Sequence, residues 1–170
     1  QASLKSTQQE ATISQIVKLP EEKRMLLIKT LCMDLMKIHS VKIVHGDLKP
    51  ENILISRSQN GELICKLIDF DDSYFSQKPP LPADTMGTEE YWSPELAEYK
   101  VTEDTSLASN ITCQSDIFAL GLILHEYCTG KMPDTHGGGN AYEYVYEGGI
   151  LIADKSIKSE KLQSLINSML

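Results

Sequence analysis

Long apolar runs and patterned cysteines are both missing from this sequence. The longest apolar run, residues 117–124, has eight residues, whereas a helix that crosses a bilayer needs about 20. The four cysteines are scattered, without the spacing of a disulfide framework or a metal site, and we interpret them as reduced thiols. We therefore expect a protein with no membrane partner, in a reducing compartment.

Positive charge and early glycine are also scarce. Sixteen Lys and Arg against 24 Asp and Glu give a net charge of −8 at pH 7, which argues against a nucleic-acid partner. No glycine occurs before Gly46, so the first 45 residues contain no glycine-rich loop. The opening residues lack the pattern of a secretory signal, and we expect a cytoplasmic protein. The start at Gln1 without an initiator Met indicates a piece of a longer protein.

The most informative stretch is a polar loop between two short apolar runs. Residues 43–44 enter the loop and residues 53–55 leave it, and between them lie Asp47, Lys49 and Asn52. Loops that are held by rigid strands often carry catalytic side chains. We therefore take residues 43–55 as the candidate catalytic region.

A hairpin is expected directly after this loop. The pair Asn60-Gly61 is typical of a two-residue hairpin turn, and an apolar run follows it up to Asp69. With these two residues as the turn, Asn52 is predicted to face Asp69 at the open end of the hairpin. The same register predicts the pairs Leu54 with Leu67 and Ile53 with Ile68.

The predicted hairpin brings together groups that suit phosphoryl transfer. The amide oxygen of Asn52 and the carboxylate of Asp69 are hard ligands of the kind that Mg²⁺ prefers when it carries nucleotide phosphates. Asp47 is suited to accept a hydroxyl proton, and Lys49 to offset charge on a transferring phosphoryl group. Singly, each carboxylate reads as an ordinary turn or strand-end residue; together, they favour a catalytic site.

Two of these segments resemble the eukaryotic-type protein kinases. Residues 45–52 (HGDLKPEN) resemble the kinase catalytic loop, and residues 69–71 (DFD) resemble the magnesium-binding triplet. The resemblance implies ATP and Mg²⁺ as cofactors, with Asn52 and Asp69 as metal ligands. It also places Lys49, Glu51 and Leu54 at the nucleotide, Leu54 at the floor of the adenine site.

Residues 69–95 are similar to a kinase activation segment. Its proline-rich middle excludes regular structure, and residues 87–95 (GTEEYWSPE) resemble the end of that segment, with Ser93 where the family usually has Ala. The resemblance implies that Thr88 hydrogen-bonds the catalytic Asp47 and Lys49. Glu95 matches a glutamate that usually pairs with an arginine lying beyond the end of this chain.

Helices are expected on both sides of the catalytic region. Residues 20–39 carry an apolar face, and residues 115–129 are apolar all round, which is typical of a fully buried helix. Ser115 is a candidate cap for the second helix and Gly130 its stop. By resemblance, Asp116 braces the catalytic loop, while His45 packs near Phe70.

The remaining segments carry weaker signals. Residues 1–18 are predicted to be a linker or a short helix. The glycine-rich segment 136–140 follows no strand, so we interpret it as a connection and not as a phosphate-binding loop. Short helices are expected over residues 141–147 and 159–170.

The expected fold is α+β and mostly helical: the large C-terminal lobe of a kinase, built around a buried central helix, with a small hairpin that carries the catalytic loop. The small N-lobe, with its glycine-rich ATP loop, is absent, and we expect the rest of the polypeptide to supply it. The fragment alone is expected to be inactive.

The sequence departs from the kinase pattern at two positions. Gly46 replaces an arginine that often binds a regulatory phosphate, and Asp71 replaces glycine in the metal triplet.

Three functions are compatible with these residues. The first is ATP- and Mg²⁺-dependent phosphorylation of Ser/Thr hydroxyls in protein substrates. The second is a small-molecule phosphotransferase similar to aminoglycoside or choline kinases, and the third is a catalytically dead scaffold. Lys49 and residues 87–95 favour protein substrates over small molecules, and the intact polar set around Asp47 favours an enzyme over a scaffold.

Overall fold

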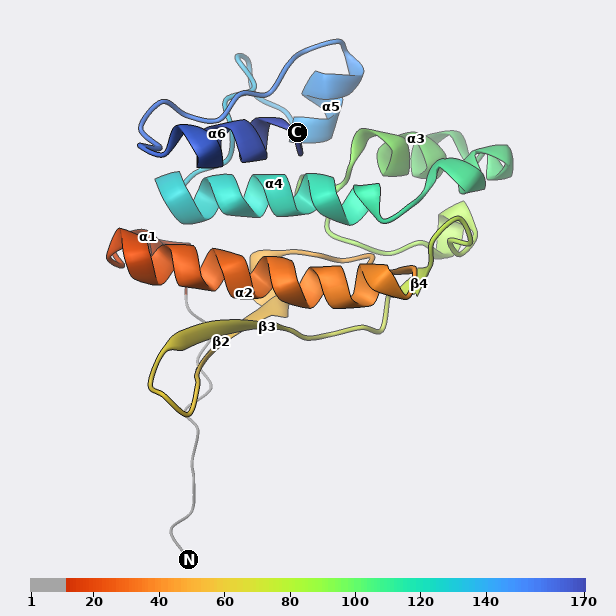
Figure 1. The fold of residues 1–170 in the computed structure, drawn as a ribbon. Helices are drawn as coiled ribbons and strands as arrows, with labels where there is room; N and C mark the ends of the chain where they lie inside the picture. The colour runs from red at the N-terminus through yellow and green to blue at the C-terminus, as the bar shows by residue number, and fades with distance from the viewer. Residues whose placement is uncertain (1–11) are drawn as a thin grey trace, which may run out of the picture.

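A computed structural model describes residues 12–170 of the chain (Figure 1). Its helices are α1 (Ile13–Val17), α2 (Glu21–Ser40), α3 (Pro94–Thr102), α4 (Gln114–Thr129), α5 (Ala141–Tyr146) and α6 (Glu160–Asn167). Its strands are β1 (Ile43–Val44), β2 (Ile53–Arg57), β3 (Leu63–Leu67) and β4 (Tyr74–Phe75). Short 3₁₀ helices occur at Pro50–Asn52, Pro82–Asp84, Glu89–Tyr91 and Thr105–Asn110.

Two expectations concern the predicted N-terminal linker and membrane-spanning helices. Residues 1–11, most of the predicted linker, lie outside the described residues, and α1 occupies part of the remainder. From residue 12 onward, the chain forms no helix with both the length and the apolar character that a bilayer requires.

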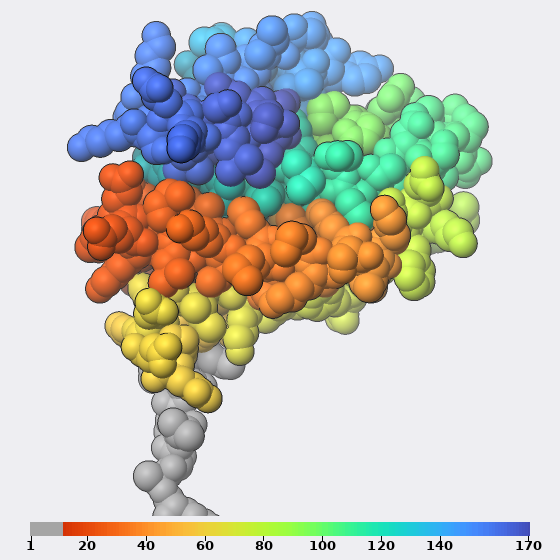
Figure 2. Space-filling model, viewed as in Figure 1, coloured from red at the N-terminus to blue at the C-terminus, as the bar shows by residue number. Residues whose placement is uncertain are grey.

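The elements stack in layers around α2 and α4. Figure 1 shows the β2–β3 hairpin on one side of α2, α4 on the other side, and α6 beyond α4. The space-filling view shows α2 running across the middle of one face, between the hairpin and the C-terminal helices (Figure 2). The main core lies between these layers and includes Leu27, Leu31, Ile53 and Ile123, none of which is more than 2% exposed.

Helix α4 is buried over nearly its whole length, as its apolar sequence predicts. Eleven of its residues are buried, among them Leu122 and Leu124. The helix ends at Gly130, whose φ of +82° suits a residue without a side chain. Ser115 does not cap the helix, contrary to expectation: Cys113 holds the cap position, and the Ser115 hydroxyl instead donates to Glu95 Oε1 at 2.9 Å.

The hairpin forms where it was predicted, but its register differs by one residue. Ile53 pairs with Leu67 and Leu54 with Lys66, so the predicted pairs Ile53–Ile68 and Leu54–Leu67 are wrong. The cause is the turn. The backbone N–H of Ser58 donates to the carbonyl oxygen of Glu62, so the loop consists of the three residues 59–61. Its last residue, Gly61, has a φ of +80°. Three-residue loops of this kind place glycine in the left-handed region.

The same shift changes the open end of the hairpin. The backbone N–H of Ile68 donates to Asn52 O at 3.0 Å, so Asn52 faces Ile68 and not Asp69. Asp69 lies one residue beyond this pair and has a φ of +62°. The direction of its side chain is therefore set by the backbone turn and not by the alternation of a strand.

A second, two-stranded sheet ties residues 74–75 to the strand that precedes the loop around Asp47. β4 pairs antiparallel with β1, so that Val44 faces Tyr74 and Ile43 faces Phe75. The sequence predicted no strand at β4, because a two-residue strand leaves too short a pattern to detect. This pairing holds the residues after Asp69 against the strand that leads into the catalytic loop.

Candidate active site

A buried carboxylate binds the backbone of the loop that carries Asp47. Asp116, in the first turn of α4, is 3% exposed. Its Oδ2 accepts the backbone N–H of His45 at 2.7 Å, and its Oδ1 accepts that of Gly46 at 3.3 Å. The ring Nε2 of His39 lies 2.8 Å from Oδ2. A negative group at a helix N-terminus also interacts favourably with the helix dipole.

Glycine at position 46 is required by the geometry of this loop. Its φ is +83°, and a Cβ placed on it would lie 2.3 Å from the carbonyl oxygen of Asp72. The arginine that many kinases carry at the matching position therefore does not fit this backbone. Gly87 approaches from the other side: a Cβ there would lie 2.9 Å from Gly46 O. The catalytic loop and the activation segment thus pack backbone against backbone.

Asp47 lies at the centre of a four-residue hydrogen-bond cluster. Its Oδ1 accepts from the backbone N–H and the hydroxyl of Thr88, both at 2.8 Å. Its Oδ2 lies 2.7 Å from Lys49 Nζ and accepts from the side-chain amide of Asn52 at 3.0 Å. Lys49 Nζ also donates to Thr88 Oγ1 at 2.7 Å. The structure therefore brings together Asp47, Lys49, Asn52 and Thr88, which come from two separate segments.

The charges of this cluster are coupled. Burial alone would raise the pKa of Asp47, but hydrogen bonds from Lys49 and Thr88 hold it below its ordinary value. The hydrogen bond to Asp47 raises the pKa of Lys49. Burial, followed by repulsion from Asp47, Asp69 and Asp71, raises the pKa of Asp72. Both members of the Asp47–Lys49 pair are thus charged at neutral pH, beside an excess of carboxylates.

Asn52 and Asp69 carry oxygen atoms of the kind that Mg²⁺ binds. The Asn52 amide group donates to Asp47 O at 2.8 Å and to Asp47 Oδ2, which leaves Oδ1 as the free acceptor. Asp69 is exposed and forms no hydrogen bond or ion pair with any described residue. Within residues 12–170, no group of three or more His, Cys, Asp or Glu side chains is arranged to hold a metal. One carboxylate and one amide oxygen instead suit a Mg²⁺ that is bound largely through phosphates.

The other candidate residues lie around this cluster. Glu51 is exposed in the 3₁₀ turn before β2, and Leu54 is half-buried in β2. The ring of His45 lies 4.9 Å from that of Phe70. Its Nε2 is 3.1 Å from Ile68 O, the position directly before Asp69. His45 is therefore a packing residue that joins the loop around Asp47 to residues 68 and 70.

Two residues near the site were not singled out from the sequence. His39, the third partner of Asp116, ends an amphipathic helix, where a histidine is unremarkable. Glu126 accepts the hydroxyl of Tyr91 at 2.8 Å; burial and the charge of Glu51 raise its pKa. Glu126 lies on the buried helix α4, and a charged residue in such an apolar helix is a usable signal.

Comparison with known proteins shows the family of this chain. The family described as the protein kinase domain matches residues 3–170, almost the whole chain. The chain belongs to the protein kinase family. This kinase chain is 32% identical over 117 residues to the serine/threonine-protein kinase DCLK3 of Mus musculus, covering 69% of the chain and 13% of that protein. It is 34% identical over 120 residues to Aurora kinase A-A of Xenopus laevis, covering 68% of the chain and 26% of that protein.

Bacterial kinases are similar as well. The probable serine/threonine-protein kinase PknB of Lactococcus lactis subsp. lactis is 40% identical over 97 residues, which cover 56% of the chain and 13% of that protein. The kinase chain thus spans about a quarter or less of the length of these relatives. Its helix-rich architecture with few strands is consistent with the large lobe of a kinase.

Proposed function

We propose that this chain is the large lobe of a serine/threonine protein kinase that transfers the γ-phosphoryl group of ATP to hydroxyl groups of protein substrates. The observation that supports the proposal most strongly is the cluster of Asp47, Lys49, Asn52 and Thr88. Its members join the catalytic loop to the activation segment through contacts of 2.7–3.0 Å. The remainder of the polypeptide would supply the small lobe and, with it, the other half of the nucleotide site.

Asp47 is the group that orients the acceptor hydroxyl and takes its proton. A carboxylate has about four lone-pair sites, and four donor atoms from Thr88, Lys49 and Asn52 already occupy those of Asp47. An acceptor hydroxyl must therefore replace one of them. Lys49 is the exchangeable partner, because it can turn from Asp47 toward the negative charge of the transferring phosphoryl group.

Thr88 and Asn52 hold Asp47 in position during this exchange. The backbone N–H and hydroxyl of Thr88 fix one carboxylate oxygen, and the Asn52 amide fixes the other from inside the buried turn. In this proposal, Asn52 Oδ1 and Asp69 would hold Mg²⁺. A Mg²⁺ ion held by these two residues would supply positive charge that stabilises the transferring phosphoryl group. Leu54 and Glu51 would contact the nucleotide beside them.

The proposal is tested by Asp47→Asn in the complete polypeptide. We expect kcat to fall by roughly 10²–10⁴-fold, because general-base catalysis is removed, while thermal unfolding changes little. Asp84→Asn, the same type of substitution at an exposed position in the 3₁₀ helix Pro82–Asp84, is the control and should keep full activity. Activity toward aminoglycosides but not proteins would show that the acceptor class is wrong, and full activity of the Asp47 variant would overturn the proposed role of Asp47.

A further inference from the structure

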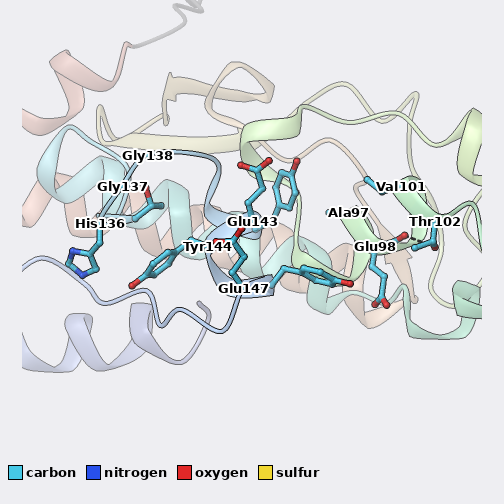
Figure 3. A pocket seen from close by; sticks show the side chains of 13 residues that line it. Ala97, Glu98, Val101, Thr102, His136, Gly137, Gly138, Glu143, Tyr144 and Glu147 are labelled. Atoms are coloured by element: carbon cyan, nitrogen blue, oxygen red, sulfur yellow. Dashed lines mark hydrogen bonds between the residues drawn. The ribbon is translucent and has the colours of Figure 1, made fainter.

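A groove of about 690 Å³ lies between α3, α5 and the glycine-rich connection, apart from the catalytic cluster. Figure 3 shows Glu143, Tyr144 and Glu147 from α5 and its C-terminal end in the middle of the view, with Glu98 and Val101 of α3 to one side. His136 and the glycines after it close the other side. The glycine-rich segment, which carries no phosphate chemistry in the kinase site, therefore forms a wall of this second hollow.

The charge of the groove has one sign. Three glutamates line it, Glu98, Glu143 and Glu147, and no lysine or arginine does. Glu143 accepts the backbone N–H of Asn140 through Oε2 at 2.8 Å. The carboxylates of Glu98 and Glu147 form no hydrogen bond or ion pair with residues 12–170. Three carboxylates without a cationic partner in a concave site attract a positively charged ligand.

Aromatic rings provide flat apolar surface beside these charges. The Tyr144 ring lies 5.9 Å from that of His136 in an edge-on arrangement. A Cβ on Gly149 would lie 2.5 Å from the same tyrosine ring. Any larger residue at position 149 would therefore clash with the ring in its present position. Tyr146 lines the groove and is 66% exposed. Tyrosine faces stack with guanidinium groups, and neighbouring carboxylates accept their fork of N–H donors.

The groove is connected to the catalytic cluster through one residue. Glu89 directly follows Thr88, the residue that bonds Asp47. Glu89 Oε1 accepts the hydroxyl of Tyr142 at 2.8 Å and the side-chain amide of Asn140 at 3.2 Å. Tyr142 itself lines the groove. The segment that carries Thr88 is therefore in contact with a wall of the groove through Glu89 and Tyr142.

We propose that this groove binds an arginine-bearing segment of the protein substrate, at a distance from the phosphorylated residue. The proposal rests on the proposed kinase function only in naming a substrate as the source of the segment. Charge complementarity selects the ligand: an acidic peptide or a nucleic acid would face three carboxylates, and a second copy of a chain with net charge −8 is repelled in the same way.

The test measures binding directly and needs no catalysis. The complete polypeptide is titrated into a fluorescent eight-residue peptide that contains three arginines and no hydroxyl residue. Its matched control is the same peptide with citrulline in place of arginine, which keeps the shape and removes the charge. The Glu98→Gln, Glu147→Gln double variant is compared with a charge-matched control, Glu62→Gln, Glu160→Gln, at exposed positions outside the groove.

We expect the groove variant to bind the arginine peptide about tenfold more weakly, and the control variant to keep the parental affinity. The parent should also lose affinity as the salt concentration rises from 50 to 500 mM. Equal binding of the citrulline peptide, preference for an acidic peptide, or unchanged affinity in a folded groove variant would overturn the proposal. An Asp47→Asn variant should keep this affinity while losing phosphoryl transfer, so failure of the groove and failure of the kinase function appear in different assays.

Discussion

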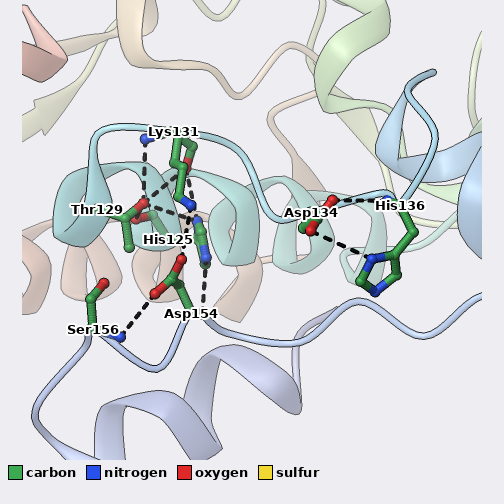
Figure 4. Close-up of polar contacts among 7 residues, drawn as sticks. All are labelled: His125, Thr129, Lys131, Asp134, His136, Asp154 and Ser156. Atoms are coloured by element: carbon green, nitrogen blue, oxygen red, sulfur yellow. Dashed lines mark hydrogen bonds and ion pairs between the residues drawn. The ribbon is translucent and has the colours of Figure 1, made fainter.

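The two ends of α4 each anchor loops, but with groups of different charge. Near its N-terminus, the side chain of Asp116 accepts the backbone N–H groups of His45 and Gly46. Near its C-terminus, the buried His125 bonds two loops through both ring nitrogens (Figure 4). Nε2 accepts the backbone N–H of Asp154 at 3.1 Å, and Nδ1 lies 2.8 Å from Lys131 O. The acceptor role of Nε2 places the proton on Nδ1, so this histidine is neutral.

The difference follows from what each anchor must hold. Asp116 meets only donors, and a carboxylate with several lone pairs satisfies them all. His125 meets one donor and one acceptor, and a neutral imidazole matches that pair. Charged groups at the second end remain outside on the surface, where Lys131 and Asp154 form an ion pair at 2.9 Å. The same helix thus supports the loop around Asp47 with a carboxylate and the loops at its other end with a neutral ring.

Loss of the charged anchor should have the largest effect on stability. Asp116→Ala leaves the N–H groups of His45 and Gly46, and the His39 ring, without their acceptor. We expect a loss of about 3–5 kcal/mol in the free energy of unfolding, together with a fall in kcat, because the loop that carries Asp47 is no longer held. Urea denaturation and steady-state kinetics measure the two effects. Retained stability and activity would show that Asp116 is not the anchor.

Crowding of the catalytic loop is tested by Gly46→Ala. A left-handed φ together with a Cβ contact at 2.3 Å is expected to cost roughly 2–4 kcal/mol. Gly61→Ala is the matched control, because its φ is +80° but nothing lies within 4 Å of the added Cβ; it should cost only about 1–2 kcal/mol. Equal effects at the two positions would show that the contact with Asp72 is relieved easily.

Removal of the neutral anchor should have a smaller effect, confined to stability. His125→Phe keeps a ring but leaves Lys131 O and the Asp154 N–H unpaired. We expect a loss of about 1–3 kcal/mol in the free energy of unfolding and an unchanged kcat, because the loops that it holds are remote from Asp47. A drop in kcat as large as that of the Asp116 variant would remove the distinction between the two ends.

The smallest expected effect is the change with pH in the stability that His125 contributes. Burial lowers the pKa of His125, so the unfolded chain takes up a proton near pH 6.5 while the folded chain does not. The stability contributed by the neutral ring is therefore complete above this pH and decreases as the pH falls toward the folded-state pKa. The measurement is the stability gap between the parent and His125→Phe at pH 7.5 and at pH 5.5. A gap that does not narrow in acid would contradict the assignment of a neutral ring.

Local signals predicted much of the fold and of the site. Apolar periodicity predicted a helix over residues 20–39, which runs from Glu21 to Ser40, and uninterrupted apolar character predicted the buried α4. These predictions succeed because such patterns repeat over several turns. Short contiguous motifs singled out Asp47, Lys49, Asn52 and Thr88, and the structure brings these four residues into contact.

Tertiary structure decided what depends on one residue of register or on partners far along the chain. Whether Gly61 closes a two- or a three-residue loop moved Asn52 from Asp69 to Ile68, a difference too small for sequence patterns to show. The neutral state of His125 and the three partners of Asp116 depend on contacts that join segments up to 77 residues apart. The sequence shows which chemical groups are present, but only the packed structure shows which atoms come into contact. Hydrogen bonds depend on distances in space, and these cannot be read from the separation of two residues along the chain.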